Sequence, residues 1–116
     1  MERVARRQEL AAYGEERVAE WYRASGFDVV ARNWRCPQGE LDLVLGHGDL
    51  IVVCEVKTRS STVFGAPVEA VTRAKQARLR RAAARWLEEG SYHAGLVRFD
   101  VASVLGGVVE VVEGAF

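Results

Sequence analysis

The chain has 116 residues, and its 49% hydrophobic content is sufficient for one domain with its own core. Sixteen basic and sixteen acidic residues give a formal net charge of zero, so any affinity for a polyanion must come from local clusters. The sequence has no signal-peptide pattern, no apolar run of membrane-spanning length and no zinc-site spacing of its cysteines. We therefore expect a single cytoplasmic domain over residues 1–116 with no membrane contact, in which Cys36 and Cys54 are inert.

The first predicted element is an amphipathic helix over residues 6–25. Glu15 lies on its apolar stripe, and the preceding Gly14 permits close approach of this helix to a sheet. The helical neighbours of Glu15 on that stripe are Ala11, Val18 and Tyr22. An acidic side chain on the buried side of a helix is either an ion-pair partner or part of a site. If the first turn has a different register, Glu16 takes this place.

Residues 27–33 predict a first strand, followed by Trp34 and Arg35 and a polar loop to Gly39. Trp34 could stack on nucleic acid and Arg35 could bind its phosphates. A structural role is equally compatible with the pattern, with Trp34 closing one end of the core and Arg35 in solvent.

Two apolar segments, residues 41–45 and 50–57, flank the turn sequence Gly46-His47-Gly48-Asp49 and predict a β-hairpin. In a symmetric register, Leu45 lies opposite Leu50 and Glu40 lies opposite Glu55. One face is then apolar and contains Leu41, Leu43, Leu45, Leu50, Val52, Cys54 and Val56. The other face contains Val44, Ile51 and Val53, followed by Glu40, Asp42, Glu55 and Lys57.

Asp42 and Glu55 are diagonal neighbours in this register, so both carboxylates could reach one ion. A hard divalent cation such as Mg²⁺, or Mn²⁺, would relieve their mutual repulsion. The alternative is an ordinary salt-bridged strand end formed by Glu40, Asp42 and Lys57. Glu55 weakens this alternative because it interrupts a run that is apolar on both faces, where an uncompensated charge is costly.

The polar stretch of residues 58–65 follows Lys57, and we interpret it as a mobile loop at the mouth of the site. It contains Arg59, a candidate for contact with nucleic acid. The alternative is a plain connector in which Phe64 packs into the core.

Pro67 predicts the start of a long helix over residues 68–89. Its core-facing stripe comprises Val71, Leu79, Ala82, Ala83, Trp86 and Leu87. No acidic residue occurs between Ala70 and Leu87, whereas basic residues are frequent there. They are Arg73, Lys75, Arg78, Arg80, Arg81 and Arg85. Solvated helical faces normally mix charge signs, so the side with Lys75, Arg78 and Arg85 favours phosphate binding over a simple solvated surface.

Residues 98–104 and 108–112 predict a last hairpin, in which Asp100 pairs with Arg98. His47 and His93 have no partner at metal-ligand or triad spacing. The resulting order αβββαββ predicts an α/β sandwich with helices packed on a mixed sheet.

The arrangement of Asp42 with Glu55-Val56-Lys57 resembles the motif of the PD-(D/E)xK nuclease superfamily, with Leu41 in place of the proline. Residues 9–112 as a whole resemble the YraN family, which is regarded as endonuclease-like and similar to archaeal Holliday-junction resolvases. The matching segments are Gly14-Glu15, Gly26-Phe27, Arg32-Asn33-Trp34-Arg35, Gly39-Glu40-Leu41-Asp42-Leu43, Glu55-Val56-Lys57-Thr58-Arg59, Phe64-Gly65, Lys75 and Arg98-Phe99-Asp100-Val101.

This resemblance implies a restriction-endonuclease-like αβββαβ core that hydrolyses DNA, preferably branched or structured DNA, with Mg²⁺ or Mn²⁺. It implies metal binding by Asp42, Glu55, the Val56 carbonyl and Glu15, with Glu40 orienting these ligands and Lys57 orienting the attacking water. The residues expected at the nucleic acid are Arg35, Arg59, Lys75, Arg78 and Arg85. A homodimer is expected by analogy, since a symmetric cut needs two sites. The alternatives are a module that binds nucleic acid or protein without cutting, and an assembly protein.

Overall fold

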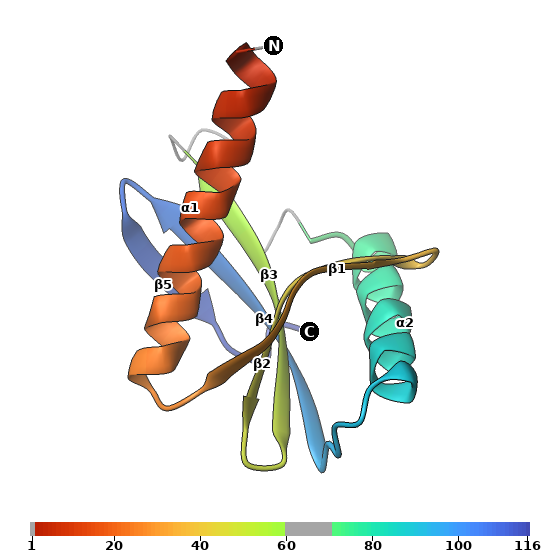
Figure 1. Ribbon diagram of the computed structural model, residues 1–116. Helices are drawn as coiled ribbons and strands as arrows, with labels where there is room; N and C mark the ends of the chain where they lie inside the picture. Colours follow the sequence, from red (N-terminus) through yellow and green to blue (C-terminus); the bar gives the residue numbers. More distant parts are fainter. Residues whose placement is uncertain (1, 60–70) are drawn as a thin grey trace.

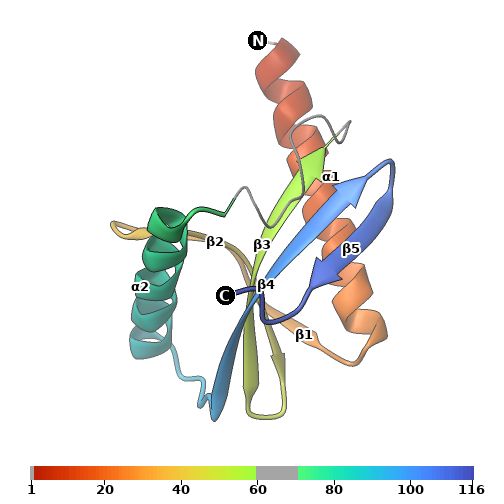
Figure 2. The same ribbon diagram turned by 180° about the vertical axis from the view of Figure 1, so that it is seen from behind.

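A strongly twisted five-stranded sheet lies between two helices (Figure 1), and the view from behind in Figure 2 shows one helix on each of its faces. The computed structural model describes residues 2–59 and 71–116, with side chains from residue 5 onward. The elements are α1 (Glu2–Ala24), β1 (Asp28–Cys36), β2 (Gly39–His47), β3 (Leu50–Arg59), α2 (Arg73–Glu89), β4 (Leu96–Leu105) and β5 (Val108–Val112). Within these ranges, neither helix is long and apolar enough to cross a membrane.

The strands follow one another across the sheet in chain order, β1-β2-β3-β4-β5. β3 and β4 are parallel, and all other neighbouring strands are antiparallel. Parallel neighbours require a crossover connection, and α2 lies in the chain between β3 and β4. The mixed sheet with packed helices confirms the α/β fold predicted from the sequence, and its element order is that expected for a restriction-endonuclease-like core.

α1 covers one face of the sheet because its apolar stripe meets the alternate residues of the central strands. The buried cluster on this side comprises Val18, Ala19, Tyr22, Leu43, Leu45, Val52, Cys54, Ala102 and Val104. It also contains the fully buried carboxylate of Asp100, which accepts a hydrogen bond of 2.6 Å from the Tyr22 hydroxyl. Asp100 accepts further hydrogen bonds from Arg98, as predicted, and from the Gly114 N–H, so its burial is compensated.

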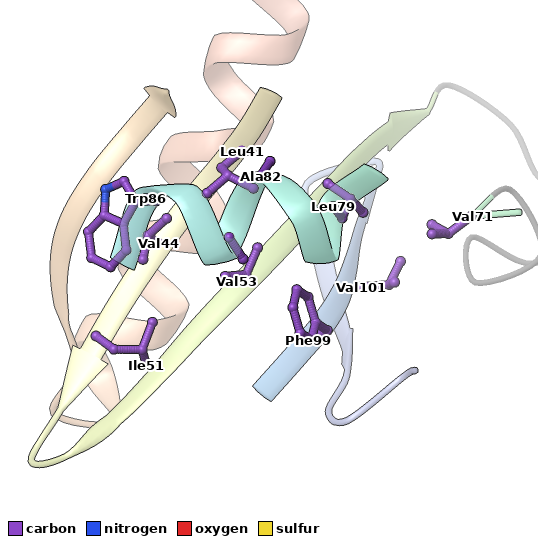
Figure 3. Packing of buried hydrophobic residues seen from close by; sticks show 11 residues of the cluster. Leu41, Val44, Ile51, Val53, Val71, Leu79, Ala82, Trp86, Phe99 and Val101 are labelled. Carbon is purple, nitrogen blue, oxygen red and sulfur yellow. The ribbon is translucent and has the colours of Figure 1, made fainter. Parts of the chain in front are cut away.

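α2 covers the opposite face, where its buried side chains interlock with β2, β3 and β4 (Figure 3). The cluster comprises Leu41, Val44, Ile51, Val53, Val71, Leu79, Ala82, Ala83, Trp86, Phe99 and Val101. Arg80 of α2 lies over the rings of Phe99 and Phe116, at 5.0 and 5.4 Å from their centroids. This arginine therefore packs on the core surface through cation–π contacts.

The predicted bounds of the helices and of the first strand were wrong in part. α1 begins at Glu2 instead of residue 6, and β1 continues to Cys36. α2 begins at Arg73 instead of residue 68, because Thr72 is its N-cap and accepts a 3.2 Å hydrogen bond from the Lys75 N–H. The expected loop began at residue 58, but β3 extends to Arg59, and the rest of that loop, with Phe64, lies outside the described residues.

The predicted register of the β2–β3 hairpin was wrong by two residues. His47 pairs with Leu50 across a two-residue turn in which Gly48 has a φ of 61°. The facing assignments of the predicted register survive this error, because side chains alternate with a period of two. Leu43, Val52 and Cys54 share the α1 face as predicted, whereas Glu55 meets Lys75 of α2. Leu41 is the exception, since it packs under α2 with Val44 instead of beside Leu43.

The close approach of α1 to β3 depends on Gly14. A Cβ atom at this position would collide with the Thr58 side chain. Alanine normally favours a helix over glycine by about 1 kcal/mol, but here we expect Gly14→Ala to lower the free energy of unfolding by about 1–3 kcal/mol. Chemical denaturation measures this change, and adding Thr58→Ala should recover part of the loss. A net stabilisation by Gly14→Ala alone would contradict the observed packing.

Candidate functional site

The site begins where the regular alternation of β1 and β2 breaks. Leu41 and Leu43 are two residues apart but pack on opposite faces of the sheet, and Asp42 lies between them. The neighbouring strand is irregular at the matching position, since Asn33 has a φ of 48°, a rare value for a residue other than glycine. This paired irregularity turns Asp42 toward β3, where its Oδ2 accepts a 2.9 Å hydrogen bond from the Val56 N–H.

Asp42 and Glu55 form a hydrogen-bonded pair of carboxyl groups at this end of the sheet. Glu55 is only 6% exposed. Burial and the neighbouring Glu55 raise the pKa of Asp42 to about 8, although the Val56 N–H acts in the opposite direction. Burial also disfavours ionised Glu55, but the hydrogen bond with Asp42 and the charges of two lysines outweigh it and lower the Glu55 pKa. The pair therefore favours the state in which Asp42 keeps its proton while Glu55 is ionised.

Lys75 of α2 and Lys57 of β3 supply the positive charge beside this pair. The Lys75 Nζ lies 3.2 Å from Glu55 Oε2. Burial disfavours both ammonium groups, but the attraction of Glu55 outweighs it at Lys75 and raises the Lys75 pKa. At Lys57, burial and the contact with Lys75 outweigh the attraction of Glu55 and lower the Lys57 pKa. Two carboxyls and two amines thus form one coupled cluster.

Glu15 lies at the edge of this cluster on α1. It is half-buried, and the Asn33 Nδ2 donates a 3.0 Å hydrogen bond to its Oε2. Burial raises the Glu15 pKa, Glu40 and Glu55 add to the rise, and Asn33 opposes it. Glu16, by contrast, is paired with Arg23 at 3.0 Å and with Arg32 at 2.7 Å. Of the two candidates on α1, the structure therefore turns Glu15 toward the site.

A hollow of about 300 Å³ opens between α1 and the end of β3. Its lining includes Arg7, Glu15 and Lys57, together with Val56 and Thr58. The hollow is therefore lined by charges of both signs and is open to a polar ligand.

The donors at this site suit a hard divalent cation, although they do not form a complete cage. In the parts of the chain that are described, no group of three His, Cys, Asp or Glu side chains lies at metal-binding distances. Mg²⁺ usually keeps several waters and binds proteins through one or two carboxylates, which Asp42 and Glu55 provide. Val56 contacts Asp42 through its N–H.

The remaining predicted residues are distributed around this centre. Glu40 does not lie opposite Glu55, because of the corrected register, and instead forms a 3.3 Å ion pair with Arg35. Arg78 is exposed on α2, and Arg85 is bound by Glu89 at 3.4 Å and by Gln38 at 3.5 Å. Arg59 ends β3.

The sequence interpretation missed two features of the site. Lys75 was assigned to the phosphate-binding side of the helix, whereas its ammonium lies against Glu55. Asn33 was noted only as part of a family-like segment and was given no role, although it holds Glu15 and carries the unusual backbone angle. The isolated lysine in an arginine-rich helix was a usable signal for the first, because lysine and arginine are not interchangeable in ion pairs. No sequence pattern predicts the second.

The five-stranded mixed sheet with a helix on each face is an α/β fold consistent with the restriction-endonuclease-like class. The chain belongs to the family described as Uncharacterised protein family UPF0102, whose model matches residues 14–104, and this confirms the YraN-family resemblance. It is 60% identical over 96 residues to a UPF0102 protein of Beutenbergia cavernae, a match that covers 83% of this chain and 81% of the relative. A UPF0102 protein of Frankia casuarinae is 50% identical over 112 residues, covering 92% of this chain and 95% of the relative.

The proton held by the Asp42–Glu55 pair should make the stability of the protein depend on pH. The pKa of Asp42 rises from 3.8 to about 8 on folding, so between these values the folded protein binds more protons than the unfolded chain. The stability linked to this proton is complete below the lower value and is lost as pH rises through the higher one. Asp42→Asn imitates the protonated carboxyl, so this variant should keep that contribution to stability at high pH.

In metal-free buffer, we expect Asp42→Asn to gain stability relative to the unmodified protein between about pH 5 and about pH 9, by on the order of 1–3 kcal/mol. Urea denaturation across this pH range measures the difference. Asp28→Asn is the matched control, because Asp28 is exposed at the start of β1. A constant difference between Asp42→Asn and the unmodified protein would show that Asp42 ionises normally.

Proposed function

We propose that this protein is a metal-dependent endonuclease that hydrolyses phosphodiester bonds in DNA. The observation that carries the proposal is the buried Asp42–Glu55 carboxyl pair, which contacts Lys75 and interacts with the charge of Lys57. Buried like charges are costly, and a purely structural strand end has no need of them. Strongly perturbed carboxyls and amines that meet at one point are typical of functional sites.

In this proposal Asp42 and Glu55 would hold Mg²⁺ or Mn²⁺, with Glu15 and the Val56 carbonyl as further donors. When bound, the metal ion would polarise the phosphate and lower the pKa of a coordinated water. Lys57 donates hydrogen bonds that orient the attacking water and balance the charge that develops on the phosphate. Burial and the neighbouring Lys75 lower the Lys57 pKa, and a lower pKa makes its ammonium a stronger hydrogen-bond donor to this water. Asn33 fixes the direction of Glu15 through its amide.

The surroundings of the pair support a polyanionic substrate. α2 contains six basic residues and presents Arg73, Arg78 and Arg81 as exposed side chains. Phosphate contacts by such arginines, and by Arg35, Arg59 and Arg85, would offset the repulsion between the DNA backbone and the carboxylates. The similarity of the YraN family to Holliday-junction resolvases makes branched DNA the preferred candidate, and a second copy of the chain would supply the second cut.

The test is a cleavage assay with Mg²⁺ or Mn²⁺ on linear, nicked, flapped and four-way DNA. We expect cleavage by the unmodified protein and a loss of at least about 100-fold for Asp42→Asn and for Lys57→Ala. The Asp42→Asn variant should bind DNA in metal-free buffer at least as tightly as the unmodified protein, because it adds no charge and, above the Asp42 pKa, removes a repulsive one. Asp28→Asn is the control and should cleave normally.

Two results would overturn the proposal. The first is an absence of cleavage on every DNA in the panel, without stabilisation of the protein by either metal. Retained DNA binding in that case would identify a binding module on a nuclease fold. The second is equal cleavage by the unmodified protein and by Asp42→Asn, which would place the chemistry elsewhere.

A further inference from the structure

The chain has sixteen basic residues besides its histidines, and only Lys57 and Lys75 among them are lysines. The other fourteen are arginines, including every other cation of α2. Both lysines meet at the Asp42–Glu55 pair. Outside the site, the basic side chains of this protein are thus arginines, whereas the two basic side chains at the carboxyl pair are lysines.

This choice has a chemical consequence at Glu55. Guanidinium is planar, weakly hydrated and suited to a lasting two-pronged ion pair, whereas ammonium is a compact and strongly hydrated point charge on a flexible stem. Lys75 makes a single contact of 3.2 Å with Glu55 Oε2. It is the kind of contact that a small cation could replace.

The position of Lys75 allows such a replacement. Its side chain is 30% exposed, whereas that of Glu55 is 6% exposed, so the ammonium lies between the buried carboxylate and solvent. Lys75 belongs to the first turn of α2, whose backbone is fixed by the Thr72 cap. The side chain can therefore move away from Glu55 while the helix and the strand stay in place.

We propose that Lys75 is a stand-in cation that compensates the carboxyl pair when no divalent ion is bound and leaves Glu55 when an ion binds. The inference rests on the proposed function, since it assumes that Asp42 and Glu55 receive a metal ion. Lys75 acts as a positioning residue on the pair and competes with the metal for Glu55. Binding of the metal ion therefore has two effects. It fills the site, and it frees the Lys75 ammonium to contact phosphate beside the exposed arginines of α2.

The first experiment measures Mn²⁺ affinity by calorimetry without DNA, at a pH above the Asp42 pKa. Because Lys75→Met removes a competing charge about one contact distance from the metal position, we expect its Kd for Mn²⁺ to fall about tenfold. Lys75→Arg keeps the charge and should bind Mn²⁺ no more tightly than the unmodified protein. Arg81→Met is the matched control, because it removes a cation from the exposed side of the same helix.

The stability of the metal-free protein provides the reciprocal measurement. Lys75→Met leaves Glu55 without its ammonium partner, so its melting temperature should fall in chelator and recover more in Mn²⁺ than that of the unmodified protein. A residue with a merely structural role would lower the melting temperature equally in both conditions.

A second experiment uses the unmodified protein and therefore does not depend on the folding of a variant. Lys75 is labelled with an amine-reactive ester and quantified by mass spectrometry, with and without Mn²⁺. We expect slow labelling in chelator and severalfold faster labelling in Mn²⁺, because the ion releases the ammonium from Glu55. In Glu55→Gln, labelling of Lys75 should be fast in both conditions.

The outcomes separate this inference from the proposed function. Mn²⁺ binding by the unmodified protein, with equal or weaker binding by Lys75→Met and no change in Lys75 labelling, would overturn the stand-in role and leave the metal site intact. No Mn²⁺ binding by the unmodified protein or by Lys75→Met would overturn both. Tighter binding by Lys75→Met, or Mn²⁺-dependent labelling, supports the exchange.

Discussion

The arrangement of the site is constrained by the burial of two carboxyl groups, Asp42 and Glu55, in contact with each other. Two charges at this separation in a poorly hydrated place cannot both persist without compensation. The protein provides it in three ways: a proton shared by the pair, the Val56 N–H, and the ammonium of Lys75. Each of these lowers the cost of burying negative charge, and the proposed metal ion would act in the same way.

The secondary structure elements serve this arrangement from both faces of the sheet. α2 brings Lys75 to the pair and covers its own face through the cluster around Trp86. α1 approaches β3 closely at Gly14, which places Glu15 beside the irregular segment of β1. The hydrogen-bonded Asp100, fully buried under α1, shows that this fold accepts an internal carboxylate when every oxygen is satisfied. The Asp42–Glu55 pair differs because its compensation includes a proton and the partly exposed ammonium of Lys75.

Much of this could be predicted from the sequence because it depends on periodicity. The face of the sheet on which Glu55 lies was predicted correctly despite a register error of two residues, since an even shift preserves side-chain alternation. Leu41 was placed on the wrong face because alternation assumes a regular strand, and β2 is irregular at Asp42. The single lysine in an arginine-rich helix marks Lys75 as unusual, but its partner Glu55 could not be predicted, because helical spacing gives the faces of a helix but not the strand residue beneath its first turn. The late start of α2 followed from the Thr72 cap, which competed with the more visible signal of a proline.

The measurement that tests the central claim most directly is the number of protons released when Mn²⁺ binds. Calorimetry in buffers of different ionisation enthalpy gives this number at each pH. If the Asp42–Glu55 pair receives the ion, the proton that it holds must leave, so about one proton should be released near pH 7 and almost none near pH 9. Asp42→Asn should release none at either pH. Mn²⁺ binding without proton release near pH 7, or with equal release from the Asp42→Asn variant, would contradict the account.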